Sequence, residues 1–210
     1  MLVDLHVHTV FSGDAVMAPE ELIARAEAME LGGIAVTEHD SYAASEATAA
    51  LAEGSDLIVF RGIEVATDMG HLLVFGLEDD DWRTLQNPVT GVVPARSLVP
   101  YVLDRAGVVI AAHPFKSTSP SLGERVLSLS GVNIVEGFNG RCFSDENVRA
   151  CQLAQAHGLR IVGGSGAHLV SEVGRCVTEF EERIETLSEL VAALKAGRFR
   201  GRYYGRLAEW

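Results

Sequence analysis

Short apolar runs rich in β-branched residues alternate with helical patterns along the whole chain, and this alternation restricts the folds open to it. Seven strand-like runs lie at residues 2–8, 33–37, 57–60, 72–75, 108–112, 132–136 and 160–162. Strands separated by helices predict a mostly parallel sheet, because each helix carries the chain back to the start of the next strand. A closed barrel is one natural arrangement of such units.

The helical segments between these runs have recognisable ends. The first opens with Pro19 and two glutamates, as helix N-termini prefer, and stops at Gly32. Glycines directly after residues 106, 157 and 196 are typical of helix C-termini. The expected helices span residues 19–31, 42–53, 94–106, 122–129, 145–157 and 188–196. Residues 78–93 are expected to form a loop, and residues 198–210 a packed or frayed terminus.

Composition narrows the class of protein. The 210 residues, with 48% hydrophobic and 22% charged side chains, predict a single globular domain over residues 1–210. The sequence has no apolar run near the ~20 residues of a transmembrane helix and no secretory signal pattern, so we expect a soluble cytoplasmic protein. A net charge of −12 argues against an extended nucleic-acid-binding surface. Cys142, Cys151 and Cys176 form no C-x-x-C pair and are expected to be buried free thiols.

The first strand-like run contains His6 and His8. Alternate residues of a strand face the same side, so the two imidazoles project together. Asp14 follows a few residues later, and two imidazoles with a nearby carboxylate form the beginning of a divalent metal site. Two unrelated histidines near a terminus are the alternative, and the positions of the other histidines decide between them.

Six of the seven histidines lie at or next to the ends of strand-like runs, where the active sites of parallel α/β proteins gather. His157 lies in a helix and is explained as a cation near the helix C-terminus. A catalytic zinc ion takes three protein ligands, so the remaining set indicates two or three metal ions, with Glu64 as the bridging carboxylate. His71 precedes its strand, so a tight turn after Glu64 must bring it back to the site.

These motifs resemble the PHP family of metal-dependent phosphoesterases, named for polymerase and histidinol phosphatase. The resemblance runs from the motif DLHVHT, which begins at Asp4, to the motif SGAH, which begins at Ser165. It implies an α/β fold, a distorted (β/α)7 TIM-like barrel of the PHP type, and a centre of two or three Mn, Fe or Zn ions. The positions that match family metal ligands are His6, His8, Asp14, His39, Glu64, His71, His113 and His168.

One position departs from the family pattern. Family members usually carry Ser-Asp-Ala-His near the last strand, with the aspartate as a metal ligand, whereas this chain has Gly166 in its place. Glycine supplies no carboxylate. The chain is therefore either an active enzyme with one ligand fewer or a metal-binding module with reduced or no catalysis.

The activity that the resemblance implies is hydrolysis of a phosphomonoester, a small phosphodiester or an oligonucleotide. A metal-bound hydroxide at a di- or trinuclear centre would attack phosphorus while the metal ions polarise the phosphoryl oxygens. Lys116, Arg141 and Arg175 lie beyond strand ends, where they are candidates to bind a small phosphorylated substrate. Asp4 and Asp40 are candidates to orient histidine ligands. Cleavage of an amide or a cyclic ester, as in related metal hydrolases, is a third alternative.

Overall fold

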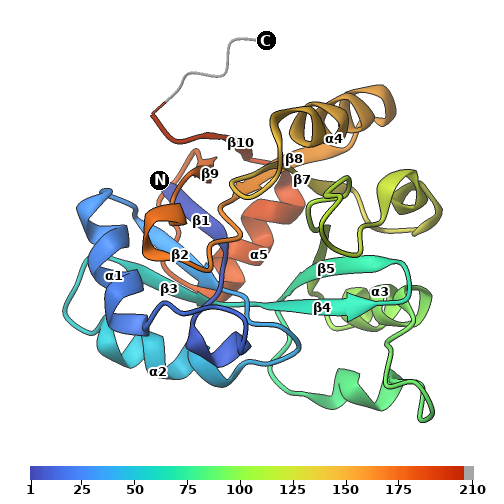
Figure 1. The fold of residues 1–210 in the computed structure, drawn as a ribbon, viewed down its shortest axis with the longest axis horizontal. Coiled ribbons are helices and arrows are strands. Elements are labelled where there is room, and N and C mark those ends of the chain that lie inside the picture. Colours follow the sequence, from blue (N-terminus) through green and yellow to red (C-terminus); the bar gives the residue numbers. More distant parts are fainter. Residues whose placement is uncertain (206–210) are drawn as a thin grey trace.

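The structure, a computed structural model, describes residues 1–205, so the last five residues of the predicted terminal segment lie outside it. The described strands form two five-stranded sheets with helices packed around them (Figure 1). The first sheet has the order β10-β9-β1-β2-β3. Its strands β1 (Leu2–Val7), β2 (Gly33–Val36) and β3 (Ile58–Arg61) are parallel. β9 (Cys176–Phe180) runs antiparallel to β1, and β10 (Phe199–Tyr203) runs antiparallel to β9.

The second sheet has the order β4-β5-β6-β7-β8. β4 (Ile63–Thr67) and β5 (Gly70–Phe75) form an antiparallel hairpin, and β6 (Val108–Ala111) runs antiparallel to β5. β7 (Ile134–Asn139) and β8 (Arg160–Gly164) continue parallel to β6. Each of the seven predicted strand-like runs overlaps one of these strands.

The predicted closed barrel of seven strand–helix units is wrong. Within residues 1–205 neither sheet closes on itself, and the two sheets meet at isolated bridges such as Val7–Ala167 and His39–Glu64. The sequence analysis missed β4, β9 and β10, which all take part in antiparallel pairs. β4 follows β3 after Gly62 alone, with no helix between them. Since an antiparallel neighbour needs no crossover helix, these strands interrupt the strand–helix alternation that a barrel of parallel strands requires.

The helices are α1 (Pro19–Ala28), α2 (Ala43–Leu51), α3 (Ala95–Asp104), α4 (Ser144–His157) and α5 (Leu187–Ala196). Four short 3-10 helices are η1 (Val10–Ser12), η2 (Asp81–Leu85), η3 (Gly123–Ser128) and η4 (Val170–Glu172). The helix predicted at 122–129 is thus 3-10, and the loop predicted at 78–93 contains η2 with the fully buried Trp82. Gly158 and Gly197 cap α4 and α5 in the left-handed conformation, as predicted.

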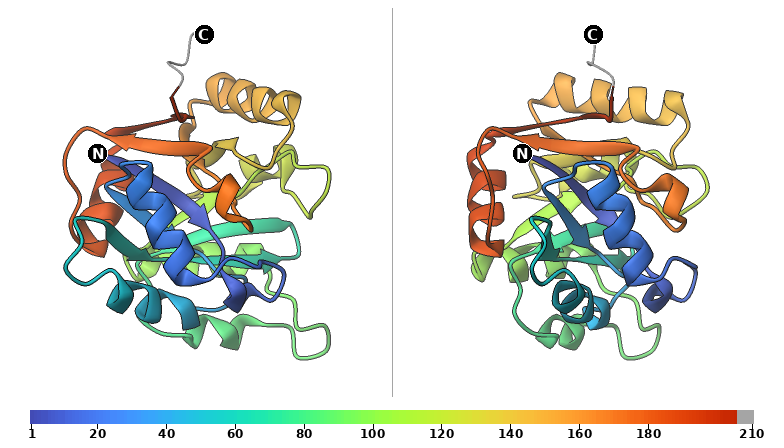
Figure 2. Two further views of the ribbon diagram at one scale, coloured as in Figure 1. Left: turned by 60° about the vertical axis from the view of Figure 1, so that its left-hand side comes forward. Right: turned by 90° about the vertical axis from the view of Figure 1, so that its left-hand side faces the viewer.

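The apolar side chains form an inner core between the two sheets. Val3, Leu5, Phe60, Phe75 and Ile110 belong to this core, and α5 packs against it. α1 and α2 cover the outer face of the first sheet, and α3 and α4 that of the second. α5 lies across one end of the inner core, away from the loops that follow β1 and β8 (Figure 2). The opposite end is therefore free to carry a polar site.

All three cysteines are free thiols, as predicted. Cys151 and Cys176 are buried, which confirms the prediction for them, whereas Cys142 is only half-buried. Among the described helices, none combines the length and the apolar character needed to cross a lipid bilayer.

Candidate metal centre

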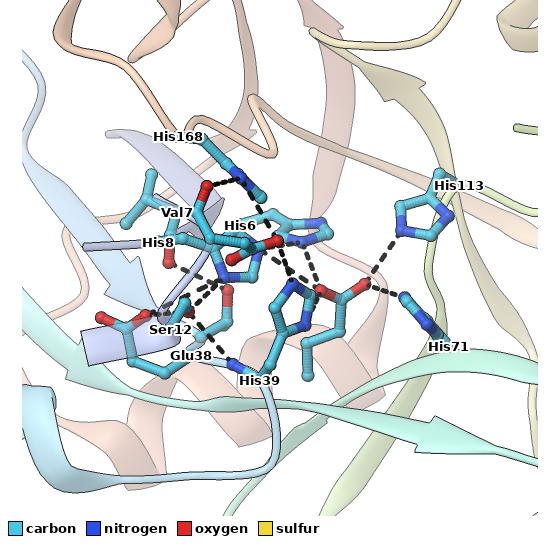
Figure 3. Close-up of polar contacts among 12 residues, drawn as sticks. His6, Val7, His8, Ser12, Glu38, His39, His71, His113 and His168 are labelled. Atoms are coloured by element: carbon cyan, nitrogen blue, oxygen red, sulfur yellow. Dashed lines mark hydrogen bonds and ion pairs between the residues drawn. The ribbon is translucent and has the colours of Figure 1, made fainter. Parts of the chain in front are cut away.

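The loops at the end of the molecule away from α5 enclose a cavity of about 350 Å³. Its histidines come from distant parts of the chain: His6 and His8 from the end of β1, His39 from the loop after β2, and His113 from the loop after β6 (Figure 3). All positions that match family metal ligands line this one cavity, namely His6, His8, Asp14, His39, Glu64, His71, His113 and His168. His157, at the C-terminus of α4, is exposed and is not among the lining residues.

Glu64 is buried among the imidazoles, with its side chain 1% exposed. Its Oε2 atom lies 3.3 Å from Nε2 of His6, 3.3 Å from Nε2 of His8 and 3.1 Å from Nδ1 of His39. Its Oε1 atom lies 3.0 Å from Nδ1 of His71 and 2.9 Å from Nε2 of His113. Each carboxylate oxygen thus faces its own set of imidazoles, which is the arrangement that a carboxylate bridging two metal ions requires.

The β4–β5 hairpin explains how His71 reaches this cluster although it precedes most of its strand. Ala66 pairs with His71 in the ladder, which places His71 beside the strand that carries Glu64. Gly70 makes the turn at φ +128°, and the Thr67 hydroxyl donates a hydrogen bond to the Gly70 carbonyl oxygen. The hairpin supplies the tight turn that the sequence analysis required.

A third group of side chains lies at the mouth of the cavity. The Oδ2 atom of Asp14 lies 3.3 Å from Nε2 of His39 and 3.5 Å from Nδ1 of His168. The ring nitrogens of His8, His39 and His168 also lie within 4.8 Å of one another. Asp14 is 53% exposed, so this group is open to a ligand from outside, whereas the Glu64 group is enclosed.

Two buried carboxylates that the sequence analysis did not identify orient the first two histidines. Nδ1 of His6 lies 3.0 Å from Oε1 of Glu136. Nδ1 of His8 lies 3.0 Å from the Ser12 hydroxyl, which donates to Glu38. These contacts leave the two Nε2 atoms, 3.0 Å apart, facing each other and Glu64. Holding the far nitrogen in this way fixes the ring for a ligand on the near one.

Asp4 and Asp40, predicted to orient histidines, have other roles. Asp4 is fully buried and accepts hydrogen bonds from the backbone N–H groups of His6, Ser165 and Gly174. Asp40 accepts one from the backbone of Ala66. The sequence does contain a signal for Glu136, which is an acidic residue at the end of an apolar strand-like run. Since an unpaired carboxylate is rarely buried, a carboxylate in such a run indicates a partner.

The pKa values of the cluster follow from burial and from the two inner carboxylates. Burial opposes a charge on His6, but the Glu136 and Glu64 carboxylates outweigh it and raise the pKa of His6 to about 10. Burial holds the pKa of His8 well below its ordinary value. Burial would raise the pKa of Glu64, yet His6 and the other imidazoles hold it well below its usual range. The lowered pKa values favour the ionised form of Glu64 and the neutral form of His8, and these are the forms that bind metal ions.

The donor set fits divalent metal ions. Ligand atoms that lie within 4.8 Å of one another come from three overlapping groups: His6, His8 and Glu64; His39, Glu64 and His71; and His8, His39 and His168. Imidazole nitrogens with carboxylate oxygens suit Zn, Fe and Mn. Nδ1 of His113 is buried without a hydrogen-bond partner among the described residues, and Nε2 faces Glu64.

Two of the three cations predicted to bind substrate line the cavity, and the third does not. Lys116 and Arg141 line the cavity. Arg175 is not among the lining residues; it borders a separate groove with Arg25 and lies 3.8 Å from Glu172. Arg141 also contacts Glu172, with 3.7 Å between its Nε and the carboxylate.

Known proteins share the fold of this chain. Residues 144–199, from α4 into β10, match a family model described as PHP-associated. The fold superposes with a TM-score of 0.74 on a two-domain protein from Bacteroides vulgatus that contains a predicted PHP-like metal-dependent phosphoesterase; the two are 19% identical, over 97% of this chain and 64% of that one. The family model covers the C-terminal part of the chain, and the structural match shows that the chain shares the fold of a PHP-like protein.

Two further proteins extend the comparison. An amidohydrolase from Chromobacterium violaceum, solved with bound sulfate and no metal, gives a TM-score of 0.67 at 18% identity, over 94% of this chain and 96% of that one. An uncharacterized protein of Methanocaldococcus jannaschii is 27% identical over 193 residues, which is 87% of this chain and 71% of that protein.

Gly166, where the chain departs from the PHP family pattern, borders the cavity. Its N–H donates to the carbonyl oxygen of His6 at 2.7 Å, and its φ of +59° lies in the left-handed region. A Cβ atom at this position would lie 2.8 Å from Nδ2 of Asn139. Asn139 is fully buried and donates to Glu136, so it has little freedom to move aside. The space beside Gly166 is thus occupied by a side chain from β7.

Proposed function

We propose that this chain is a metal-dependent hydrolase of phosphate esters, acting on a phosphomonoester or a small phosphodiester. The observation that carries the proposal is Glu64, whose two carboxylate oxygens face separate sets of imidazoles inside a cavity that Lys116 and Arg141 also line. Cations beside a multi-metal centre suit a substrate with a negatively charged, hydrolysable group. The names of the solved structures support a hydrolase, since one contains a predicted phosphoesterase and another is an amidohydrolase.

The proposal assigns the ligands in three groups. His6 and His8 would hold one ion with Oε2 of Glu64, and His71 and His113 a second with Oε1. A third ion would bind at the mouth of the cavity, held by Asp14, His39 and His168. The ions would be two or three in number, and Mn, Fe and Zn all suit these donors.

Bound divalent ions would polarise the phosphoryl oxygens and lower the pKa of a water molecule. Lys116 and Arg141 would bind the remaining phosphoryl oxygens, and the planar guanidinium of Arg141 suits a bidentate contact. Hydrolysis forms a bond from the water oxygen to phosphorus and breaks the bond from phosphorus to the ester oxygen. The departing alcohol takes one proton from the water, and phosphate keeps the oxygen. Glu136 and Glu38 would keep His6 and His8 aligned throughout.

A metal-binding module with little or no turnover is the second candidate, and Gly166 is the observation that favours it. The carboxylate that the family pattern has at this position is missing, and Asn139 occupies the adjoining space. The first candidate has the stronger support, because the other ligand positions and two substrate-facing cations all line one cavity.

The test combines metal analysis with a substrate panel. The purified chain is loaded with Mn²⁺, Fe²⁺ or Zn²⁺, its metal content is measured, and hydrolysis of p-nitrophenyl phosphate, its bis ester and a set of amides is followed. We expect at least two equivalents of metal and turnover of a phosphate ester. Tightly bound metal without turnover of any phosphate ester would support the binding module instead. Faster hydrolysis of an amide than of any phosphate ester would indicate an amide hydrolase instead.

A further inference from the structure

A loop that carries hydroxyl groups forms part of the same cavity wall. Lys116, Thr118 and Ser119, from the segment that follows His113, all line the cavity. The Ser119 hydroxyl oxygen is buried and has no hydrogen-bond partner among residues 1–205. Buried hydroxyls in folded proteins nearly always have a partner, and leaving one unpaired costs free energy. We therefore expect a ligand bound in the cavity to provide the partner of Ser119.

The loop holds Ser119 in place before any ligand arrives. The Ser121 hydroxyl lies 3.0 Å from the carbonyl oxygen of His113, 2.9 Å from that of Lys116 and 3.2 Å from that of Ser119. The backbone N–H of Ser117 donates to Oε1 of Glu146 in α4 at 2.7 Å. These contacts hold the backbone of the loop, so ordering the loop costs little conformational entropy when a ligand binds beside Ser119.

The charges of the cavity wall indicate which ligand suits it. Lys116 and Arg141 contribute two cations, and the carboxylates in the lining are Glu64 and Asp14, both already paired with imidazoles. Gly166 adds no third carboxylate. A phosphomonoester carries close to two negative charges near pH 7 and has three unsubstituted oxygens. A phosphodiester has one charge and two such oxygens, so it offers one acceptor fewer.

The size of the cavity agrees with a small ester. Ligand pockets span roughly 300–1,000 Å³, and the cavity of about 350 Å³ is near the lower limit. It has room for a phosphoryl group and a small alcohol portion.

We propose that Ser119 is a specificity-determining residue that donates a hydrogen bond to the third unsubstituted oxygen of a phosphomonoester, so that the site selects monoesters over diesters. This inference rests on the proposed phosphoesterase function and names its substrate class. Thr118, Lys116 and Arg141 contribute to binding the same phosphoryl group. Ser119 contacts the bound substrate and takes no part in bond breaking.

The test uses two esters with the same leaving group, p-nitrophenyl phosphate and methyl p-nitrophenyl phosphate, on the Mn²⁺-loaded protein. We expect the wild type to prefer the monoester in kcat/KM by at least about tenfold. Ser119→Ala should lower kcat/KM for the monoester about tenfold and for the diester less than about twofold. Ser130→Ala, which changes an exposed serine outside the cavity, is the matched control and should change neither.

A binding measurement keeps this inference separate from the proposed function. Calorimetry with inorganic phosphate and dimethyl phosphate should show that Ser119→Ala weakens phosphate binding about tenfold and leaves dimethyl phosphate unchanged. Two results would overturn the role of Ser119: an equal loss of kcat/KM for both p-nitrophenyl esters in Ser119→Ala, or an unchanged affinity of that variant for inorganic phosphate. Failure to hydrolyse either ester would overturn the proposed function, while the phosphate measurement would still decide whether Ser119 recognises the third oxygen.

Discussion

Single residues of the centre show how a protein can bury several charges together. Glu64 and Glu136 lie inside the protein with almost no exposure, where an isolated carboxylate would be very unfavourable. His6 lies between them, 3.3 Å from Glu64 and 3.0 Å from Glu136, so each charge is compensated. Compensation by imidazoles that can also bind metal ions is what separates this cluster from an ordinary buried ion pair.

His8→Ala tests the assignment of His8 as a ligand. The variant should lose metal and lower kcat/KM for a phosphate ester at least about 100-fold, since even the outer partners of metal ligands contribute 10–100-fold. Elemental analysis and steady-state assays on the same preparation measure both effects. His157→Ala, at the exposed end of α4, is the control and should lose neither metal nor activity. Full metal content in His8→Ala would contradict the assignment.

Glu136→Gln tests the orienting carboxylate. Glutamine can still bond to the backbone N–H of His113 and to Asn139, but it removes the negative charge beside His6. We expect metal affinity to fall about 10–100-fold, measured by competition with a chromogenic chelator. Glu185→Gln, at an exposed surface position, should leave the affinity unchanged. An unchanged affinity in Glu136→Gln would show that the contact with His6 has no effect on the metal.

At the scale of elements, the β4–β5 hairpin brings Glu64 and His71 together. Glu64 and His71 are seven positions apart in the chain. A crossover helix needs more residues than that, whereas a hairpin brings His71 directly to the Glu64 carboxylate. The turn depends on Gly70, whose φ of +128° suits glycine alone, and a Cβ atom there would lie 2.6 Å from the backbone nitrogen of Leu122. The hairpin is therefore locked against the loop before η3.

Gly70→Ala should lower the free energy of unfolding by about 1–3 kcal/mol and reduce the amount of bound metal, because the displaced turn carries His71 with it. Urea unfolding of the metal-free protein and metal analysis measure the two effects. Gly54→Ala is the matched control: its φ is +86°, but no atom lies within 4 Å of the added Cβ. This control should show a smaller stability loss and unchanged metal content.

At the scale of the whole molecule, the candidate centre joins the two sheets. His6 belongs to β1 in the first sheet and His8 follows that strand directly, whereas Glu64 and His71 belong to β4 and β5 in the second. The sheets share isolated bridges in place of a continuous ladder. Ions bound between these side chains would connect the sheets at the end opposite α5.

Removal of metal by EDTA should therefore lower the melting temperature. A ligand at 100 times its dissociation constant contributes about 2.7 kcal/mol, which corresponds to roughly 5–10 °C for a domain of this size. Differential scanning calorimetry with and without EDTA measures the shift. His8→Ala should show a clearly smaller EDTA effect than the wild type. Equal melting temperatures for the loaded and stripped wild type would contradict a metal bridge between the sheets.

Periodicity and helix ends are local properties of the chain, and they located seven of the strands and the five α-helices. They also showed that the histidines gather at strand ends. His6, His8 and Glu64 could be proposed as parts of one site for that reason. The position of Arg175 outside the cavity and the antiparallel strands β4, β9 and β10 were not accessible in this way. Strand pairing depends on contacts between distant residues.

Tertiary structure alone decided which groups complete the site. Glu136 lies 130 positions from His6 in the chain, and Asn139 fills the space beside Gly166 from a different strand. Ser119 lines the cavity in a loop whose backbone contacts the side chains of Ser121 and Glu146. Residue types and spacing indicate the chemistry of a centre, but burial and long-range packing decide which side chains orient it and which ligand it admits.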